Sequence, residues 1–273
     1  MSDIGLVWIR EDFRIENNAA LSYATQNHKN VIAFYIYNNN DYDNKREAQK
    51  WWLSKSLENF KKDLSNYKIN LEIKKGDELE IFSKIKKKDN VSIYWNKIYE
   101  PDVISKGKKI RDLFIKNEIN FKYFKGNILN EFQEVTKNDK TPFKVFTPFW
   151  RTAEKIYLGL PPSKNYIVKK QSQIKSFFKN CINPNDILPK KNWHKKFENY
   201  WIVSENNSKK ILKNLIDNKI KDYGTSRDIP SLEGTSKLSP YIKFGQIHVG
   251  TIWKKCNEIK SKGIGYRKYI NEL

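Results

Sequence analysis

The run Val31-Ile32-Ala33-Phe34-Tyr35-Ile36-Tyr37 is the stretch of sequence that decides the fold. Its unbroken series of aliphatic and aromatic side chains predicts a strand that is buried on both faces. The run Gly5-Leu6-Val7-Trp8-Ile9 precedes it and predicts a second strand of the same kind. Shorter runs at residues 71–73, 91–95 and 120–124 predict three more strands.

Stretches with helical spacing lie between these runs. Apolar residues recur near one face of a helix from Arg46 to Leu64, from Asp77 to Lys87 and from Asp102 to Asn117. Alternating strands and helices over about 125 residues predict a doubly wound α/β domain with a five-stranded parallel sheet. Ligands of such sheets bind at the carboxyl ends of the strands. No G-x-G-x-x-G follows the first strand, so a dehydrogenase with a dinucleotide fingerprint is not supported.

The remaining sequence divides the chain into three parts. We predict an α/β domain over residues 1–130, a connector over 131–192 and an all-helical region over 193–273. The connector holds six of the nine prolines, so few regular elements are expected in it. Helical spacing resumes at Asn207–Ile220, Tyr241–Phe244, Val249–Ile259 and from Tyr266 to Leu273.

Composition limits the possible functions. Hydrophobic residues make up 38% of the 273 residues, which is enough for a packed core, and the net charge of +21 favours anionic partners, nucleic acid first and membrane surfaces second. However, 45 of the 52 basic residues are lysine, and such an excess can also reflect background composition. No apolar run is long enough to span a membrane, and the first residues do not resemble a signal peptide, which favours a cytoplasmic location. Two cysteines and three histidines, all far apart, predict neither a metal site nor a disulfide framework.

Three segments resemble the DNA photolyase and cryptochrome family. Residues 6–21, LVWIREDFRIENNAAL, are similar to its opening LVWFRxDLRxxDNxAL, and residues 143–151, FKVFTPFWR, are similar to its connector motif YxVFTPFW[RK]. Residues 223–245 resemble the start of its flavin domain, Y-x-x-x-R-D-x-P-x-x-x-G-T-S-x-L-S-P-x-x-x-F-G. Trp193, Phe197 and Trp201 also match its W-x-x-x-F-x-x-x-W linker, so the resemblance covers the whole chain.

The resemblance implies a light-driven enzyme. It implies an N-terminal α/β domain that binds an antenna chromophore (a folate such as methenyltetrahydrofolate, or a deazaflavin), then a long connector and the start of a helical FAD-binding domain. The implied activity is that of a deoxyribodipyrimidine photolyase, a carbon–carbon lyase that uses reduced FAD to repair cyclobutane pyrimidine dimers. The implied partner is DNA that contains pyrimidine dimers, and we expect a cytoplasmic monomer without membrane contact.

A candidate binding site for a phosphate group lies in the segment Gly234-Thr235-Ser236-Lys237-Leu238-Ser239. Ser239-Pro240 places proline at the start of a predicted helix, and hydroxyls and free N–H groups at a helix start suit a diphosphate. The alternative is an ordinary serine N-cap. The resemblance implies that FAD contacts Tyr223, Thr235, Ser236, Lys237, Leu238, Ser239 and Tyr269.

The resemblance also implies two DNA contacts. Arg227 would meet a DNA phosphate and Glu272 would hydrogen-bond the pyrimidine dimer, while an ion pair of Arg227 with Asp228 or Glu233 is the structural alternative. No catalytic residue is assigned within the chain, and the eight tryptophans are interpreted as packing residues.

Two charged segments follow predicted strands. Arg10, Asp12 and Arg14 are expected to be structural and to orient the loop after the first strand. Tyr99-Glu100-Pro101 resembles a Y-E-P element of the family near its antenna site.

The last residues resemble an F-x-x-E-L element that continues into W-R-E-F in the family. The chain therefore corresponds to about the N-terminal three-fifths of a photolyase, and we expect it to be inactive in repair on its own. Two alternatives stay open: a cryptochrome-type blue-light photoreceptor, and a stand-alone α/β ligand-binding module without FAD. The charge and Glu272 favour repair.

Overall fold

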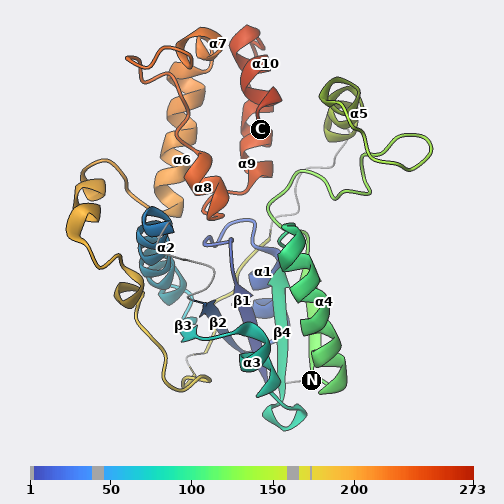
Figure 1. Cartoon of the computed structure of the whole chain (residues 1–273), viewed down its shortest axis with the longest axis vertical. Coiled ribbons are helices and arrows are strands. Elements are labelled where there is room, and N and C mark those ends of the chain that lie inside the picture. The colour runs from blue at the N-terminus through green and yellow to red at the C-terminus, as the bar shows by residue number, and fades with distance from the viewer. Residues whose placement is uncertain (1–2, 39–45, 159–165, 173) are drawn as a thin grey trace.

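A five-stranded parallel sheet lies at the centre of the protein. The computed structural model describes residues 3–38, 46–158, 166–172 and 174–273. The strands are arranged in the order β3-β2-β1-β4-β5, and every neighbouring pair is parallel (Figure 1). Their bounds are β1 Ile4–Ile9, β2 Asn30–Tyr37, β3 Asn70–Lys75, β4 Val91–Asn96 and β5 Asn120–Phe124. The predicted α/β fold with a five-stranded parallel sheet is confirmed.

Each face of the sheet is covered by helices because the strand side chains are apolar on both sides. Val7 and Ile9 of β1 pack in the cluster of α1 (Ala19–Asn27) and α2 (Glu47–Ser65). Leu6 and Trp8 point the other way, toward α3 (Glu78–Ser83) and α4 (Pro101–Lys116). This alternation produces two apolar clusters, one on each side of the sheet.

The helix starts follow local sequence signals. The Asn18 side chain accepts a hydrogen bond from the Leu21 amide at 3.1 Å and caps α1. The Asp77 carboxylate accepts one from the Leu79 amide at 2.8 Å and caps α3. Pro101 is the first residue of α4, where its missing N–H has no intrahelical partner to lose.

Three of the α-helices in the described residues were not predicted: α1, α5 and the four-residue α7 (Tyr223–Ser226). Helix α1 is short and buries Ala19, Ala20, Leu21 and Ser22 in succession, so it shows no amphipathic spacing. Helix α5 (Phe146–Leu158) lies in the connector, and Pro148 in its first turn is compatible with a helix there. The predicted helix over Asp77–Lys87 is also shorter, because α3 ends at Ser83 and a separate 3₁₀ turn, η3, spans Lys87–Asp89.

Helix α5 stands apart from the sheet (Figure 1), and its aromatic side chains contact Trp253 of the helical region. The Trp150 ring meets the Trp253 ring edge-on with centroids 5.9 Å apart, and Tyr157 meets the same ring at 5.2 Å. Farther along the connector lie two 3₁₀ helices, η4 (Pro184–Ile187) and η5 (Asn192–Asn199).

The connector also passes along the outer side of β3. The buried Glu72 carboxylate accepts hydrogen bonds from the Phe177 amide at 2.9 Å and the Phe178 amide at 2.7 Å. The Ile182 amide then donates to the Ile73 carbonyl at 2.9 Å. These contacts tie the connector to the last strand on this side of the sheet.

The C-terminal helices stand over the carboxyl ends of the strands (Figure 1). Helix α6 is capped by the Ser204 hydroxyl, which accepts a hydrogen bond from the Asn207 amide at 3.1 Å, and it passes into a π-helical turn, η6. None of the helices in the described residues is long and apolar enough to cross a membrane. The elements are α6 Glu205–Asn214, η6 Leu215–Lys219, α7 Tyr223–Ser226, α8 Ser239–Lys243, α9 Val249–Asn257 and α10 Ile264–Asn271.

The loop after β1 fixes the helical region to the sheet. The Phe13 amide donates to the Phe244 carbonyl at 3.3 Å, and Arg14 Nη1 donates to the Gly245 carbonyl at 2.9 Å. Gly245 has φ +64, and a Cβ atom there would overlap the Glu11 carbonyl. Only glycine therefore allows the two backbones to approach this closely. The side chain of Arg14 has the expected structural role.

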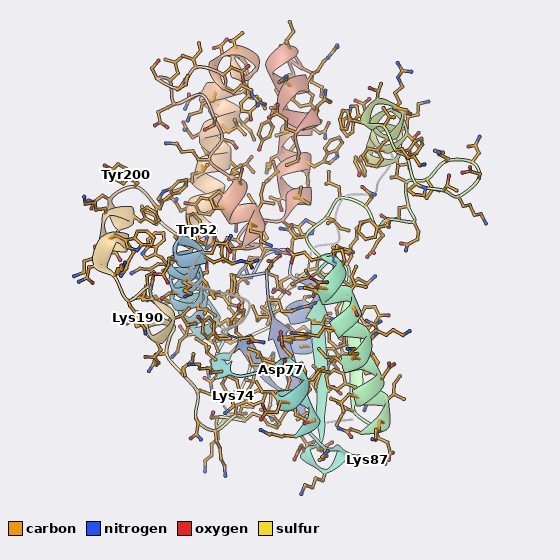
Figure 2. All side chains as sticks on the ribbon, viewed as in Figure 1. Trp52, Lys74, Asp77, Lys87, Lys190 and Tyr200 are labelled. Carbon is orange, nitrogen blue, oxygen red and sulfur yellow. The ribbon has the colours of Figure 1, made fainter. Side chains whose placement is uncertain are left out.

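We call the contact of the helical region with the loop after β1 and with α2 the seam, and buried polar groups stabilise it. Trp52, at the top of α2 in Figure 2, donates its indole N–H to Gln246 Oε1 at 3.1 Å. Gln246 Nε2 donates in turn to the Ser56 hydroxyl at 3.2 Å, and the Gln246 side chain is almost fully buried. On the other side, the Glu205 carboxylate accepts from the Ile15 amide at 2.6 Å.

Candidate functional site

Helices α7 and α10 bring four predicted site residues into contact. The Arg227 guanidinium pairs with the Glu272 carboxylate and with Asp228 at 3.1 Å. The Tyr223 hydroxyl donates to Glu272 Oε2 at 3.0 Å. The Tyr223 and Tyr269 rings meet edge-on with centroids 5.0 Å apart, and both are buried. Tyr223 and Arg227 lie more than 40 positions before Tyr269 and Glu272 in the sequence, and the fold brings the two pairs together.

A glycine permits this helix contact. Gly265 lies in the first turn of α10, and a Cβ atom there would overlap the carbonyl oxygens of Ile220 and Lys221. Any larger residue would push α10 away from the turn that precedes α7. The position of Tyr269 and Glu272 relative to Tyr223 therefore depends on Gly265.

The loop before α8 holds the other predicted cofactor residues. Thr235 and Ser239 are exposed, whereas Leu238 is fully buried in the core. The Ser236 hydroxyl accepts a hydrogen bond from the Leu238 amide at 3.3 Å. Lys237 has φ +57 and pairs with Glu233. Leu238 thus anchors the loop through its side chain, and its neighbours carry the polar groups.

Ser236 links this loop to the tyrosine pair. Burial raises the pKa of the Tyr269 hydroxyl, and a hydrogen bond with the Ser236 side chain offsets only part of that rise. Tyr269 is therefore a neutral hydroxyl at ordinary pH, beside a loop that offers hydroxyls and an ammonium group. This set of donors fits an anionic diphosphate with an aromatic portion beside it.

The two predicted DNA contacts are engaged with each other. Arg227 and Glu272 have side chains that are 29% and 34% exposed, so the pair lies at the surface. The structural alternative for Arg227, an ion pair with Asp228, is confirmed, and Glu272 is a further partner. A phosphate would have to compete with these two carboxylates for the guanidinium.

A second candidate site lies at the carboxyl ends of β1, β2 and β4. A cavity of about 540 Å³ is lined there by Arg10, Glu78 and Lys106, among others. The Arg10 guanidinium lies 4.5 Å from the centre of the Trp8 ring, and burial lowers its pKa to about 10. One Arg10 amino group donates to the Asn96 carbonyl, while its Nε has no hydrogen-bond partner among the described residues.

Lys243 closes one side of this cavity. Its ammonium group pairs with Glu11 at 2.6 Å and with Glu100 at 2.7 Å. Burial raises the pKa of Glu11, and the hydrogen bond with Lys243 offsets part of that rise. A neighbouring cavity of about 450 Å³ lies against the same lysine and is also lined by Tyr99 and Pro101. The Y-E-P element thus borders this second cavity.

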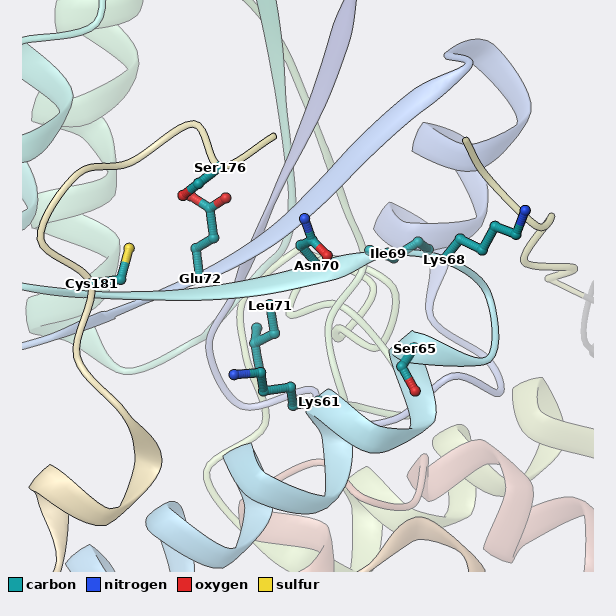
Figure 3. A pocket seen from close by; sticks show the side chains of 9 residues that line it. All are labelled: Lys61, Ser65, Lys68, Ile69, Asn70, Leu71, Glu72, Ser176 and Cys181. Atoms are coloured by element: carbon teal, nitrogen blue, oxygen red, sulfur yellow. The ribbon is translucent and has the colours of Figure 1, made fainter. Parts of the chain in front are cut away.

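A hollow of about 380 Å³ at β3 is lined by Lys61, Asn70 and Glu72, among others (Figure 3). The Glu72 carboxylate faces Ser176 and is bonded to the connector backbone. Asn70 Nδ2 donates to the Ile174 carbonyl at 2.9 Å, and Lys68 points away. In the described parts of the chain, no cluster of His, Cys, Asp and Glu side chains could hold a metal ion.

Glu78, Lys106 and Lys243 line the cavity of about 540 Å³ but were not predicted from the sequence. Glu78 and Lys106 lie in the helices that follow β3 and β4, so their place after strand ends was the available signal. Lys243 is brought to the sheet from more than 130 residues away, and no local pattern marks it.

A doubly wound parallel sheet with clustered polar groups at its carboxyl edge defines an α/β protein of the kind that binds ligands at that edge. A family model described as DNA photolyase matches residues 5–168, which is more than half of the chain. The chain belongs to the DNA photolyase family.

Curated relatives include enzymes and photoreceptors. The chain is 28% identical to the deoxyribodipyrimidine photo-lyase of Agrobacterium fabrum, over 91% of the chain and 52% of that protein. It is 23% identical to cryptochrome-1 of Arabidopsis thaliana, over 91% of the chain and 37% of that protein. The chain spans about half the length of the curated photo-lyases it matches.

Solved structures of the family share the fold. A class III photolyase from Agrobacterium tumefaciens superposes with a TM-score of 0.85 at 25% identity, covering 100% of this chain and 57% of that one. The cryptochrome of Synechocystis sp. PCC6803 gives the same TM-score at 18% identity, covering 100% and 59%. An archaeal photolyase from Sulfolobus tokodaii, solved with two FAD molecules, gives 0.75 at 20% identity, covering 98% and 56%.

Proposed function

We propose that this chain carries the antenna domain and part of the flavin site of a deoxyribodipyrimidine photolyase, which repairs cyclobutane pyrimidine dimers in light. The observation that carries this proposal is the meeting of Tyr223, Tyr269 and Ser236 beside a loop of hydroxyls and lysine, in a member of this family. We retain the division at residues 1–130, 131–192 and 193–273 as part of the proposal.

FAD is the proposed cofactor of the site between α7, α8 and α10. Thr235, Ser236 and Ser239 would hydrogen-bond its diphosphate, and Lys237 would neutralise it. Tyr223 and Tyr269 would form an apolar wall beside it, because both rings are buried. Leu238 would act through the backbone, since its side chain lies in the core. Reduced FAD, excited by light, would supply the electron that opens the dimer.

DNA would bind where Arg227 and Glu272 lie. Both side chains reach the surface, so a phosphate could take the place of a carboxylate on Arg227. Glu272, once released, would be free to accept a hydrogen bond from a base. The net charge of +21 would favour binding to DNA without selecting a sequence.

The cavity of about 540 Å³ at the strand ends is the proposed antenna site. The Arg10–Trp8 stack suits a planar, electron-rich ring, and so does Arg10 Nε, which has no partner among the described residues. A folate or a deazaflavin remains the proposed pigment. A flavin is a further choice, because the Sulfolobus tokodaii photolyase is described with a light-harvesting cofactor and two FAD molecules.

The test is flavin binding followed by repair. Purified chain would be mixed with FAD, reduced, and illuminated with an oligonucleotide that contains a pyrimidine dimer, with free FAD as the blank. Ser236→Ala should weaken FAD binding about tenfold or more, because a hydrogen bond to a charged group is lost. Ser261→Ala, at an exposed position outside the site, is the matched control. Equal FAD affinity in both variants would contradict the assignment.

A cryptochrome-type photoreceptor is the second candidate. The observation in its favour is the similarity to cryptochrome-1 of Arabidopsis thaliana over 91% of the chain. Because the chain alone is expected to be inactive in repair, the discriminating result is FAD binding with a light-induced spectral change and equal affinity for dimer-containing and undamaged DNA, which would favour the photoreceptor. A chain that binds a pigment at Arg10 and takes up no FAD would instead be a ligand-binding α/β module. Monomeric state and cytoplasmic location remain predictions.

A further inference from the structure

Lys219 lies beside the loop before α8, although it comes from a different element. It is the last residue of the π-helical turn η6, in which the Ile220 amide donates to the Leu215 carbonyl at 2.9 Å. Its ammonium group donates to the Thr235 carbonyl at 3.3 Å. A π turn holds one more residue than an α turn, which changes the direction of the side chains that follow it. The turn thus places a second cation at this loop, in addition to Lys237.

The loop also carries its own anion. Glu233 pairs with Lys237 and has a side chain that is 74% exposed. The pKa of Glu233 is lowered, first by the hydrogen bond and charge of Lys237 and further by the charge of Lys219. Among the described residues, Lys219 makes no ion pair within salt-bridge distance, so its charge is only partly balanced.

We propose that Lys219 and Lys237 together form the diphosphate clamp of this site, and that Glu233 occupies the clamp until a diphosphate displaces it. The proposal rests on the proposed function in naming FAD as the natural source of the diphosphate. Lys219 is a positioning residue as well, because it holds the Thr235 backbone.

A diphosphate can displace Glu233 because it makes more contacts with the two lysines than the carboxylate does. The Glu233 carboxylate reaches Lys237 directly but acts on Lys219 only through its field. A diphosphate carries more charge and more acceptor oxygens, so it can contact both ammonium groups and the hydroxyls of Thr235 and Ser239. An exposed ion pair is weak in water, which makes Glu233 easy to displace. Glu233 would therefore lower the affinity for anions without abolishing it.

The experiment measures the binding of inorganic pyrophosphate to the full chain by calorimetry. Lys219→Gln should weaken binding about fivefold or more, Lys219→Arg should retain most of it, and Glu233→Gln should strengthen it severalfold. Lys213→Gln is the matched control, because Lys213 is an exposed lysine of α6 that pairs with Asp217 and lies outside the loop. Opposite effects of the two Gln variants at Lys219 and Glu233 cannot arise from a common loss of folding.

The same titrations with FAD and with riboflavin separate this proposal from the flavin function. Pyrophosphate binding that depends on Lys219, without FAD binding, would uphold the clamp and remove the flavin assignment. FAD binding that is insensitive to Lys219→Gln would overturn the clamp alone. Absence of pyrophosphate binding to the unaltered chain, or weaker binding in Glu233→Gln, would also overturn it.

Discussion

The two faces of the sheet are completed in different ways. The apolar cluster under α3 and α4 consists of residues of the α/β domain, with a few connector side chains at its margin. The cluster under α1 and α2 continues into the helical region, where Tyr241 and Ile252 belong to it. One face is therefore self-contained, whereas the other is shared. The core of the helical region is continuous with the apolar cluster on this face of the sheet, so the stability of the helical region should depend on the contacts at the seam.

The largest expected effect comes from the self-contained face. Phe34 is fully buried there and packs against the rings of Phe82 and Phe178. Phe34→Ala should lower the free energy of unfolding by about 3–5 kcal/mol, because it leaves a cavity in a closed core. Urea denaturation measures this. Ile264→Ala, in the helical region and 84% exposed, should change it by less than about 0.5 kcal/mol. Similar losses for both would abolish the distinction between the regions.

The seam itself is tested by Gly245→Ala. The new Cβ would overlap the Glu11 carbonyl, and φ +64 is unfavourable for alanine, so we expect a loss of about 2–3 kcal/mol. Limited proteolysis should show earlier cleavage of the helical region. The control is Gly263→Ala, since a Cβ there meets nothing within 4 Å. If the helical region were independent of the sheet, both variants would be cut at the same rate.

The buried polar contacts of the seam should contribute less. Gln246→Leu leaves the Trp52 indole N–H without its acceptor, which should cost about 1–3 kcal/mol. Removing the donor as well, in Trp52→Phe with Gln246→Leu, should give a total loss smaller than the sum of the two single losses. A thermal-melting cycle of the four proteins measures this coupling. Simple additivity would mean that the hydrogen bond does not hold the seam.

The last expected effect appears only on acidification and is a pH dependence from His248. Its Nδ1 accepts a hydrogen bond from the Gly250 amide at 2.9 Å and caps α9, so only the neutral ring fits. Burial, with a smaller contribution from Arg14, lowers the pKa of His248 from 6.5 to about 3. The stability that this gives is complete above pH 6.5 and is lost as the pH falls toward 3.

Between about pH 7 and about pH 5 the loss should be about 2 kcal/mol, at about 1.4 kcal/mol for each pH unit below the unfolded pKa. Urea titrations at the two pH values measure it. His248→Asn keeps a capping acceptor and removes the titrating ring, so its curve should be flatter. An equal slope in both proteins would show that other groups control the acid sensitivity.

Much of the fold could be predicted from the sequence because the apolar runs of the strands and the helical spacing between them are both strong signals. Strands β1 and β2 are continuous apolar runs, and helices such as Glu47–Ser65 and Pro101–Lys116 agree with the predicted ranges to within two residues. Helix α1 could not be predicted because its small side chains are buried on every side, which removes the amphipathic spacing. Helix α5 could not be predicted because Pro148 and the other prolines of the connector favour irregular structure.

The candidate site could be predicted only in part. The motif around Gly234 identified the loop, and the fold brought Tyr223, Tyr269 and Glu272 to it. The mutual pairing of Arg227 and Glu272 depends on the contact of α7 with α10, which no local pattern encodes. The role of Lys219 could not be predicted because a π turn has no sequence signature. That of Lys243 could not be predicted because its partners lie far away in the chain.

The passage of the connector along β3 has a consequence for association between molecules. An open sheet has two edges that could pair with another chain and start aggregation. On one edge, the Ile182 amide takes up the Ile73 carbonyl, and the Glu72 carboxylate holds the connector in place. The other edge, β5, is only five residues long and carries Lys122. Both edges are thus poor templates for strand addition, so the apolar central strands β1 and β2 do not become part of a sheet that extends into a second molecule.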